Sequence, residues 1–234
     1  MENNKVLIGI PNGSGLIHHL TVESLMSLER PLDIGFHVVP RSRNDTARNE
    51  ITRIAMEQAY SYVLYMDDDN PVPPDTLTKL LEDDKDIISV PIAARKSLTN
   101  RHNACAFYAK DYGGIRTYTR IRQFKDDGYL HKVDAVGLGC TLVKRRVLEV
   151  LWKKYRDFIF EDGKITFDEP KWIAGQICKW RRLTTDLEFS ERCVDAGFEI
   201  WLDTRIKPVH IGEPNLILWE EQTVALPNID IGTS

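Results

Sequence analysis

The sequence predicts an α/β fold in which helices flank a mixed, mainly parallel sheet that carries a small antiparallel ribbon. Short apolar segments alternate with segments of helical periodicity up to Val90, a pattern typical of doubly wound sheets. After Pro91 the pattern changes to polar alternation around Gly113-Gly114, which favours antiparallel strands. A chain of 234 residues that is 42% hydrophobic can bury one large core, so we expect a single domain.

The apolar segments and their boundaries give a specific set of elements. The expected strands are 5–10, 34–39, 62–66, 86–90, 104–108, 115–124, 132–136, 140–143 and 199–203, with an extended piece at 207–212. The expected helices are 22–28, 46–59, 74–81, 146–153 and 185–197. Asn44 or Asp45 is available to cap the second helix, and Pro74 suits the first position of the third. The stretch 155–183 has no clean period and is expected to be irregular.

Charge and composition narrow the functional class. The net charge is −4 and the pI about 5.9, so no general attraction to nucleic acid or anionic lipid is expected and an anionic ligand must be held locally. The N-terminal residues lack the apolar region of a signal peptide, and no stretch approaches the ~20 apolar residues of a membrane span. The four cysteines show no metal-ligand spacing, which favours reduced thiols and a cytoplasmic protein. They are Cys105, Cys140, Cys178 and Cys193.

Three consecutive aspartates, Asp67, Asp68 and Asp69, directly follow the apolar strand 62–66. Three like charges at the end of a buried strand repel one another, and a bound cation would relieve that repulsion. Carboxylate oxygens suit Mg²⁺ or Mn²⁺, which commonly bridge to substrate phosphates. The alternative is a solvated turn before Pro71, where Asp and Asn are common.

A second polar cluster begins at Thr185. Thr185 and Glu188 have the spacing of a capping box, and Gly197 is placed to end the helix, so Asp186 falls at the first helical position. Asp186 either complements the helix dipole or acts as a general base. Further on, His210 is either a satisfied polar residue or a metal ligand.

Taken in order, these motifs resemble the GT-A glycosyltransferases, especially family-2-like enzymes of bacterial and phage type. The likeness extends from Lys5 to Gly212 and rests on the acidic turn, Thr-Asp186-Leu-Glu-Phe189 and Pro-Val-His210-Ile-Gly212. It implies a nucleotide-binding half at 1–100, an acceptor-binding half at 101–215 and a tail at 216–234.

The resemblance also implies roles for individual residues. Asp67 and Asp69 match the carboxylates of a DxD motif, which hold a divalent ion, Mn²⁺ or Mg²⁺, on the donor, although the motif could shift by one to include Asp68. His210 matches the histidine that completes the metal site, and Asp186 matches the base of inverting members. The remaining matches concern the nucleotide. Pro11 and Asn12 match the loop after the first strand that lies against the nucleotide, and Arg48 matches a residue near the nucleotide side of the cleft. Thr185 stands where the family usually has glutamate.

We therefore expect a metal-dependent enzyme that moves a sugar from a nucleotide-diphosphate sugar to an acceptor hydroxyl, with inversion. A sugar nucleotidyltransferase is one alternative, disfavoured because Pro11–Gly15 lacks a long glycine-rich phosphate loop. A non-catalytic nucleotide- or carbohydrate-binding protein is the other. The sequence does not choose among UDP, GDP, CDP and dTDP, nor does it indicate the sugar, the acceptor or the oligomeric state. Lys171, Arg181 and Arg182 are candidates for closing over the diphosphate, and Trp172, Trp180 and Trp201 for stacking on a sugar, against the simpler roles of surface charge and packing.

Overall fold

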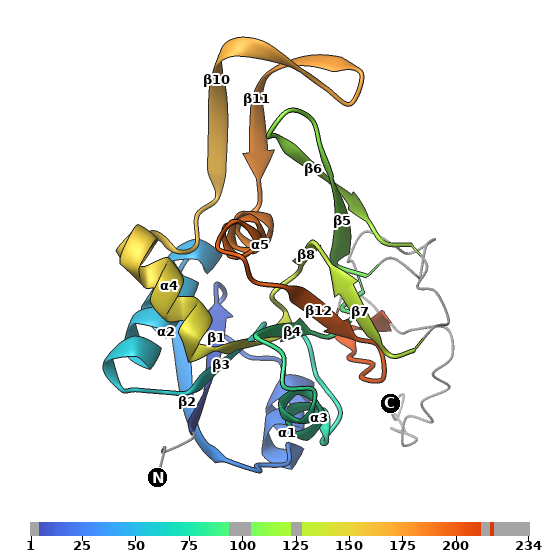
Figure 1. Ribbon diagram of the computed structural model, residues 1–234. Helices are drawn as coiled ribbons and strands as arrows, with labels where there is room; N and C mark the ends of the chain where they lie inside the picture. The colour runs from blue at the N-terminus through green and yellow to red at the C-terminus, as the bar shows by residue number, and fades with distance from the viewer. Residues whose placement is uncertain (1–4, 94–103, 123–127, 212–215, 218–234) are drawn as a thin grey trace, which may run out of the picture.

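The computed structural model describes residues 5–93, 104–122, 128–211 and 216–217 (Figure 1). Its centre is a seven-stranded sheet in the order β2-β1-β3-β9-β4-β12-β7. Strands β1 to β4 and β12 run in one direction, and β9 and β7 run in the other. This confirms the expected mixed, mainly parallel sheet, which is joined by a small antiparallel sheet in the order β6-β5-β8.

The elements follow the predicted order closely. The strands of the central sheet are β1 (Lys5–Asn12), β2 (Asp33–Pro40), β3 (Tyr62–Met66), β4 (Ile87–Ser89), β7 (Leu130–Val133), β9 (Cys140–Lys144) and β12 (Ile200–Asp203). The other strands are β5 (Ala106–Asp111), β6 (Arg116–Arg120), β8 (Ala135–Val136), β10 (Gly163–Ile173), β11 (Gln176–Leu183), β13 (His210–Ile211) and β14 (Leu216–Ile217). The helices are α1 (His19–Ser27), α2 (Asn44–Glu57), α3 (Thr76–Glu82), α4 (Arg145–Tyr155) and α5 (Thr185–Asp195), with a 3₁₀ turn η1 at Arg156–Phe158. The end of the strand predicted at 115–124, the boundary between the two predicted halves and most of the predicted tail lie outside the described residues.

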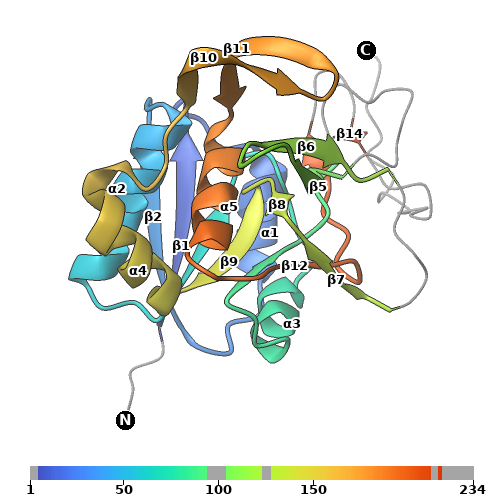
Figure 2. The same cartoon turned by 45° about the horizontal axis from the view of Figure 1, so that its top comes forward.

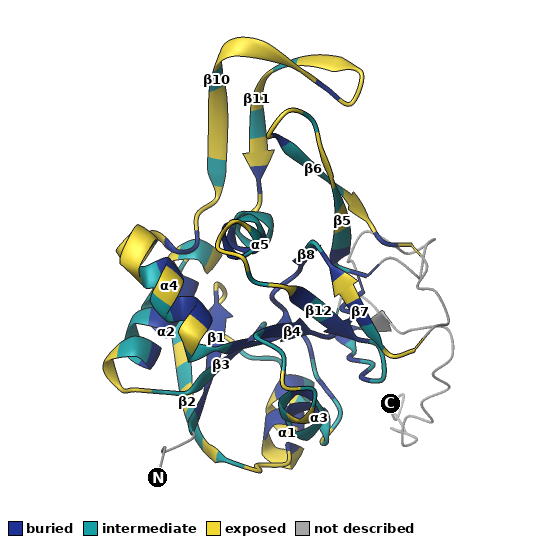
Figure 3. Cartoon of the chain, in the orientation of Figure 1, coloured by how far each residue is buried: buried dark blue, intermediate teal, exposed yellow. Residues whose placement is uncertain are grey.

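Helices cover both faces of the sheet because consecutive residues of a strand point to opposite sides. In β1, Leu7 packs on the face covered by α2, α4 and α5, whereas Val6 and Ile8 pack on the face covered by α1 and α3. Figure 2 shows these two layers on either side of the strands, and Figure 3 shows that the inner strands are buried along most of their length. No helix within the described ranges has the length and apolar composition needed to cross a bilayer.

Four predicted helix starts need correction, the first in α1, which begins at His19 and not at position 22. Helix α2 is preceded by Arg43 in the N-cap position, so Asn44 and Asp45 lie inside its first turn instead of capping it. Helix α3 begins at Thr76, because Pro74 belongs to the turn before it. The N-cap of α5 is Thr184 and makes no side-chain cap bond, so no capping box forms and Asp186 is the second helical residue, not the first.

The stretch expected to be irregular is instead a long hairpin, β10–β11. A two-residue turn joins the strands, with Ala174 and Gly175 both at positive φ (51° and 82°) between the paired residues Ile173 and Gln176. Such a turn matches the twist of an antiparallel pair. The period was not visible in the sequence because most side chains of the hairpin are exposed, so burial does not select apolar residues at every second position.

Candidate active site

The acidic turn follows the carboxyl end of β3, which is an inner strand of the central sheet. The Asp67 backbone N–H donates to the Gly139 carbonyl (2.9 Å), which ties the turn to the start of β9. Asp67, Asp68 and Asp69 are all half-buried, and the next residue, Asn70, is buried. Ligands of doubly wound sheets bind at this edge, outside the carboxyl ends of the parallel strands.

Arg48 connects the acidic turn to helix α5. Its guanidinium donates to Asp186 Oδ1 (2.5 Å) and to Asp67 Oδ1 (3.0 Å), and its side chain is only 2% exposed. Burial acts to lower the pKa of Arg48, but the carboxylates of Asp186 and Asp67 together raise it above its ordinary value. Arg48 is therefore a permanent buried cation that holds two predicted site residues together.

His210 reaches the same turn from the other end of the chain. The backbone N–H groups of Val209 and Ile211 donate to the carbonyls of Pro71 and Asp69, each over 2.9 Å. These bonds fasten the strand β13 to the acidic turn. The side chain of His210 is 10% exposed, and its Nε2 lies 3.5 Å from Asp69 Oδ2.

The surroundings of His210 determine which of its nitrogens can bind a metal. Its Nδ1 lies 2.5 Å from the Ala93 carbonyl, and because a carbonyl only accepts, Nδ1 carries the hydrogen. In the neutral imidazole the lone pair then resides on Nε2, which faces the Asp69 carboxylate. A backbone carbonyl that fixes the tautomer in this way is the usual support of a metal-bound histidine.

The chemistry of the donors is compatible with a divalent ion. Asp69 Oδ2 and His210 Nε2, 3.5 Å apart, are an oxygen and a nitrogen donor of the kinds found at such sites. Within the described ranges, no set of three or more His, Cys, Asp and Glu side chains is placed to hold a metal. Asp69 and His210 would thus supply two ligands, and phosphate oxygens and water the others.

Two asparagines are buried beside the site: Asn12, which was predicted to lie against the nucleotide, and Asn70, which was not predicted as a site residue. Asn12, at the end of β1, and Asn70 are each 1% exposed, and within the described structure Nδ2 of Asn12 and Oδ1 of Asn70 have no hydrogen-bond partner. Asn70 Nδ2 would lie 2.7 Å from a Cβ at Gly139, so only glycine leaves room for it there. A buried polar atom without a partner is costly, which is typical of sites that await a ligand. The available sequence signal was an asparagine after the three aspartates together with the Gly-Leu-Gly that packs on it.

The other predicted site residues are more dispersed. Pro11 is buried in β1 next to Asn12. Arg181 pairs with Glu191 (2.6 Å) and Arg182 with Asp162 (2.7 Å), so both contact the protein itself, while Lys171 is exposed on the hairpin. Trp201 lies in β12 under Lys85, whereas Trp172 and Trp180 are exposed on the hairpin.

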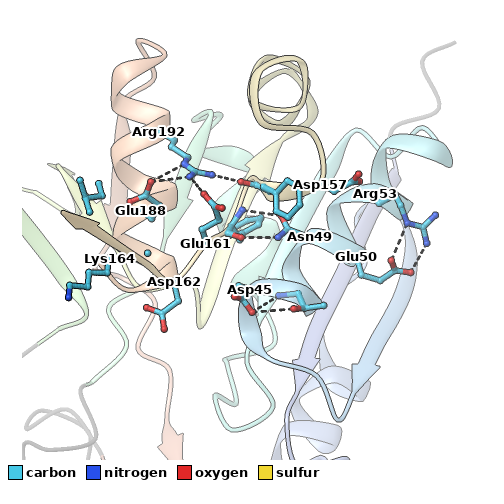
Figure 4. Close-up of a pocket in the computed structure, with 15 residues that line it drawn as sticks. Asp45, Asn49, Glu50, Arg53, Asp157, Glu161, Asp162, Lys164, Glu188 and Arg192 are labelled. Atoms are coloured by element: carbon cyan, nitrogen blue, oxygen red, sulfur yellow. Dashed lines mark hydrogen bonds and ion pairs between the residues drawn. The ribbon is translucent and has the colours of Figure 1, made fainter. Parts of the chain in front are cut away.

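A cavity of about 900 Å³ lies beside this site, between α2, η1, α5 and the base of the hairpin (Figure 4). None of the predicted site residues lines it. Several of its charged groups pair with one another: Arg192 bonds to Glu188 and Glu161, and Arg53 bonds to Glu50. We therefore place the candidate site at the strand ends, where unpaired buried polar atoms and a fixed imidazole occur.

All four cysteines carry free thiols. Burial is the largest influence on the two nearest the site, raising the pKa of Cys105 to about 11 and that of Cys140 to about 12. Only the thiolate is an effective nucleophile, so these side chains act as small apolar residues at neutral pH.

The architecture defines a GT-A glycosyltransferase fold, as the resemblance implied. Among solved structures, A197 from STIV shares it over 97% of this chain and 99% of its own, with a TM-score of 0.51 and 13% identity. CMP:2-keto-3-deoxy-manno-octonic acid synthetase complexed with CTP aligns over 89% of this chain and 90% of its own (TM-score 0.42, 11% identity). S. aureus TarS 1–349 in complex with UDP-GlcNAc aligns over 44% of this chain and 39% of its own (TM-score 0.31, 13% identity).

At such identities the likeness concerns the fold alone. No protein-family model matches the sequence, and no curated protein matches it at the sequence level.

Proposed function

We propose that this protein is a metal-dependent glycosyltransferase that moves a sugar from a nucleotide-diphosphate donor to an acceptor hydroxyl. The observation that carries the proposal is the convergence at one sheet edge of Arg48, Asp67, Asp69, Asp186 and His210, which are widely separated in the sequence. In this proposal the first half of the chain, 1–100, binds the nucleotide, and 101–215 binds the acceptor.

Asp69 and His210 are the pair that we assign to the metal, Mn²⁺ or Mg²⁺. When bound, the ion would neutralise the negative charge that develops on the diphosphate leaving group. Asp67 contacts Arg48 in this structure. For its predicted role on the metal and the ribose, Asp67 would have to contact the donor while it is paired with Arg48. Asp68, the next residue, is the alternative ligand.

Asp186 is assigned as the general base. Arg48 donates to Asp186 Oδ1, which leaves Oδ2 as the oxygen that would take the proton of the acceptor hydroxyl. A Cβ at Gly137 would lie 3.7 Å from Oδ2 and only 2.8 Å from the Cβ of Cys105, so glycine at this position lets the backbone pack closely beside the oxygen. Inversion requires a base that acts on the acceptor from the side opposite the leaving group, and in this proposal Asp186 has that role.

Calorimetric titration of UDP, GDP, CDP and dTDP tests the donor side. We expect one nucleotide to bind with Mn²⁺ and to lose most of its affinity in chelator, in Asp69→Ala and in His210→Ala. The matched control is Glu199→Ala. Glu199 is an exposed carboxylate just before β12, at the opposite end of the parallel strands from the site, and its variant should bind normally. Metal-independent binding, or binding of no nucleotide, would contradict the proposal.

Asp186→Asn tests the chemistry separately. It should lower the transfer rate by a factor of about 10² to 10⁴, the usual contribution of a general base, while nucleotide binding persists. An unchanged rate would remove Asp186 from the role of base. Turnover of a nucleoside triphosphate and a sugar phosphate would favour the nucleotidyltransferase alternative, and metal-dependent binding without any turnover would favour a binding protein.

A further inference from the structure

The hairpin β10–β11 is the most prominent feature that the proposed function does not use. Figure 1 shows both strands projecting beyond the layers of the fold, and Figure 3 shows that most of their length is exposed. At ~3.3 Å per residue, the eight residues of β11 place the turn ~25 Å from Leu183. Leu183 directly precedes helix α5, so the base of the hairpin adjoins Asp186.

Large apolar side chains gather near the turn. Trp172 is 66% exposed and Ile177 is 69% exposed, and because they are paired across the two strands they lie side by side. Trp180, further down β11, is 51% exposed. Because Trp180 lies three residues beyond Ile177, it faces the opposite side of the hairpin, and the contiguous exposed apolar surface is the pair Trp172 and Ile177 beside the turn.

The charge of the hairpin is opposite to that of the chain. Residues 164–182 carry the basic side chains Lys164, Lys171, Lys179, Arg181 and Arg182 and the acidic side chains Asp168 and Glu169, a net charge of +3 in a chain of −4. Arg181 and Arg182 pair with carboxylates at the base of the hairpin. Lys171 and Lys179 remain exposed close to the tryptophans, and the exposed carboxylates of Asp168 and Glu169 lie beside Lys171 on β10.

We propose that the hairpin tip, residues 171–180, docks the protein onto an anionic lipid surface. Indole rings favour the boundary between headgroups and acyl chains, and lysines beside them are attracted to anionic headgroups. A two-stranded hairpin leaves the outward-facing N–H and C=O groups of both strands unpaired, and the hydrated headgroup region can still satisfy them, so the tip can enter that region without crossing into the hydrocarbon core. The net charge of the whole chain predicts no general attraction to anionic lipid, whereas the attraction proposed here is confined to the hairpin.

Co-sedimentation of the full chain with phosphatidylcholine vesicles, with and without phosphatidylglycerol, tests the proposal. We expect binding only to the anionic vesicles, weakened by salt. Lys171→Ala and Lys179→Ala should each weaken it about fivefold. The double variant Trp172→Ser/Ile177→Ser should weaken it about tenfold or more. Met26→Ser, which alters a side chain 76% exposed on α1, is the matched control and should bind like the wild type.

A brominated lipid supplies a direct readout of insertion, because bromine quenches nearby indoles. Quenching should decrease in Trp172→Phe and persist in Trp201→Phe, whose ring lies in the central sheet. No binding to anionic vesicles would overturn the proposal, as would an equal loss in Met26→Ser. Self-association that the hairpin double variant abolishes, without vesicle binding, would assign the surface to a second copy. Asp69→Ala should still bind vesicles, so this test is independent of the proposed transfer reaction.

Discussion

Arg48 is the residue on which the candidate site depends most. A buried guanidinium is stable only with well-placed counter-charges, and here each of its two terminal nitrogens has a carboxylate partner. The resemblance placed Arg48 near the nucleotide, but its burial and its bond to Asp186 could not be predicted, because they depend on a contact between residues 138 positions apart. The sequence identifies charged residues in a helix but not which of them faces inward to a second segment.

Replacement of Arg48 should destabilise the protein strongly. Arg48→Met leaves Asp67 and Asp186 close together without their cation, and we expect a loss of about 2–4 kcal/mol in the free energy of unfolding, measured with urea. Arg48→Lys should recover only part of it, since a single ammonium cannot contact both carboxylates as the planar guanidinium does. On the same helix, Arg53→Ala removes the exposed ion pairs with Glu50 and Glu57 and should lower the free energy of unfolding far less. Equal losses of unfolding free energy for Arg48→Met and Arg53→Ala would show that the buried ion pairs of Arg48 stabilise the fold no more than exposed ones do.

Among the elements, helix α5 shows what local sequence predicts well. Its end was predicted from Gly197, and the structure has the expected pair of bonds, from Phe198 N–H to the Cys193 carbonyl and from Gly197 N–H to the Val194 carbonyl (both 3.0 Å). Its start was misplaced by one residue, because Thr184 and Thr185 are equally good caps in sequence. The hairpin was missed for a different reason: turn residues alone do not predict strands when neither face is buried.

The end of α5 gives a test at this scale. Gly197 has φ = +86°, where a side chain is strained, so Gly197→Ala should lower the free energy of unfolding by about 1 kcal/mol. Gly163, at the start of β10, has ordinary φ and open space at its Cβ position, so Gly163→Ala should be nearly neutral. Urea unfolding of both variants measures the difference. A neutral Gly197→Ala would mean that the helix end can rearrange without cost.

At the scale of the whole molecule, a cluster of charged side chains between the carboxyl end of β12 and the end of α3 makes stability depend on pH. Asp83, at the end of α3, shares Arg205 with Asp203, and the side chain of Asp83 is 4% exposed. Burial and then the Asp203 carboxylate raise the pKa of Asp83 to about 6, against the opposite influence of Arg205. The folded state therefore holds this proton more tightly than the unfolded chain, whose ordinary pKa is 3.8.

The sign of this linkage fixes a prediction. The stabilisation from protonated Asp83 is complete below about pH 4 and is lost as the pH rises through about 6. The wild type should accordingly lose stability relative to Asp83→Asn between pH 4 and pH 7, as measured by urea unfolding across that range. The neighbouring Asp84 provides a control of opposite sign, because a hydrogen bond from Lys144 lowers its pKa. Relative to Asp84→Asn, the wild type should lose stability as the pH falls, and parallel curves for the two variants would contradict both assignments.

At this scale the sequence predicted the strands and helices of the layered core, but not the hairpin β10–β11. Alternating apolar segments specify the sheet, and the carboxyl end of β3 followed directly from the position of the aspartates. Pairing across long separations was not predictable, as the bonds between β13 and the acidic turn illustrate. Those bonds bring His210 to Asp69, and only the folded chain reveals them.

Strand β9 has a consequence for dividing the chain. It pairs with β3 on one side and β4 on the other, so a strand from the second half separates two strands of the first. Residues 1–100 expressed alone would lack the central strand of their own sheet, and residues 101–234 would carry that strand with both edges bare. The two halves named for their ligands are therefore not independent folding units, and a split version of this protein requires both fragments in the same solution to regain its sheet.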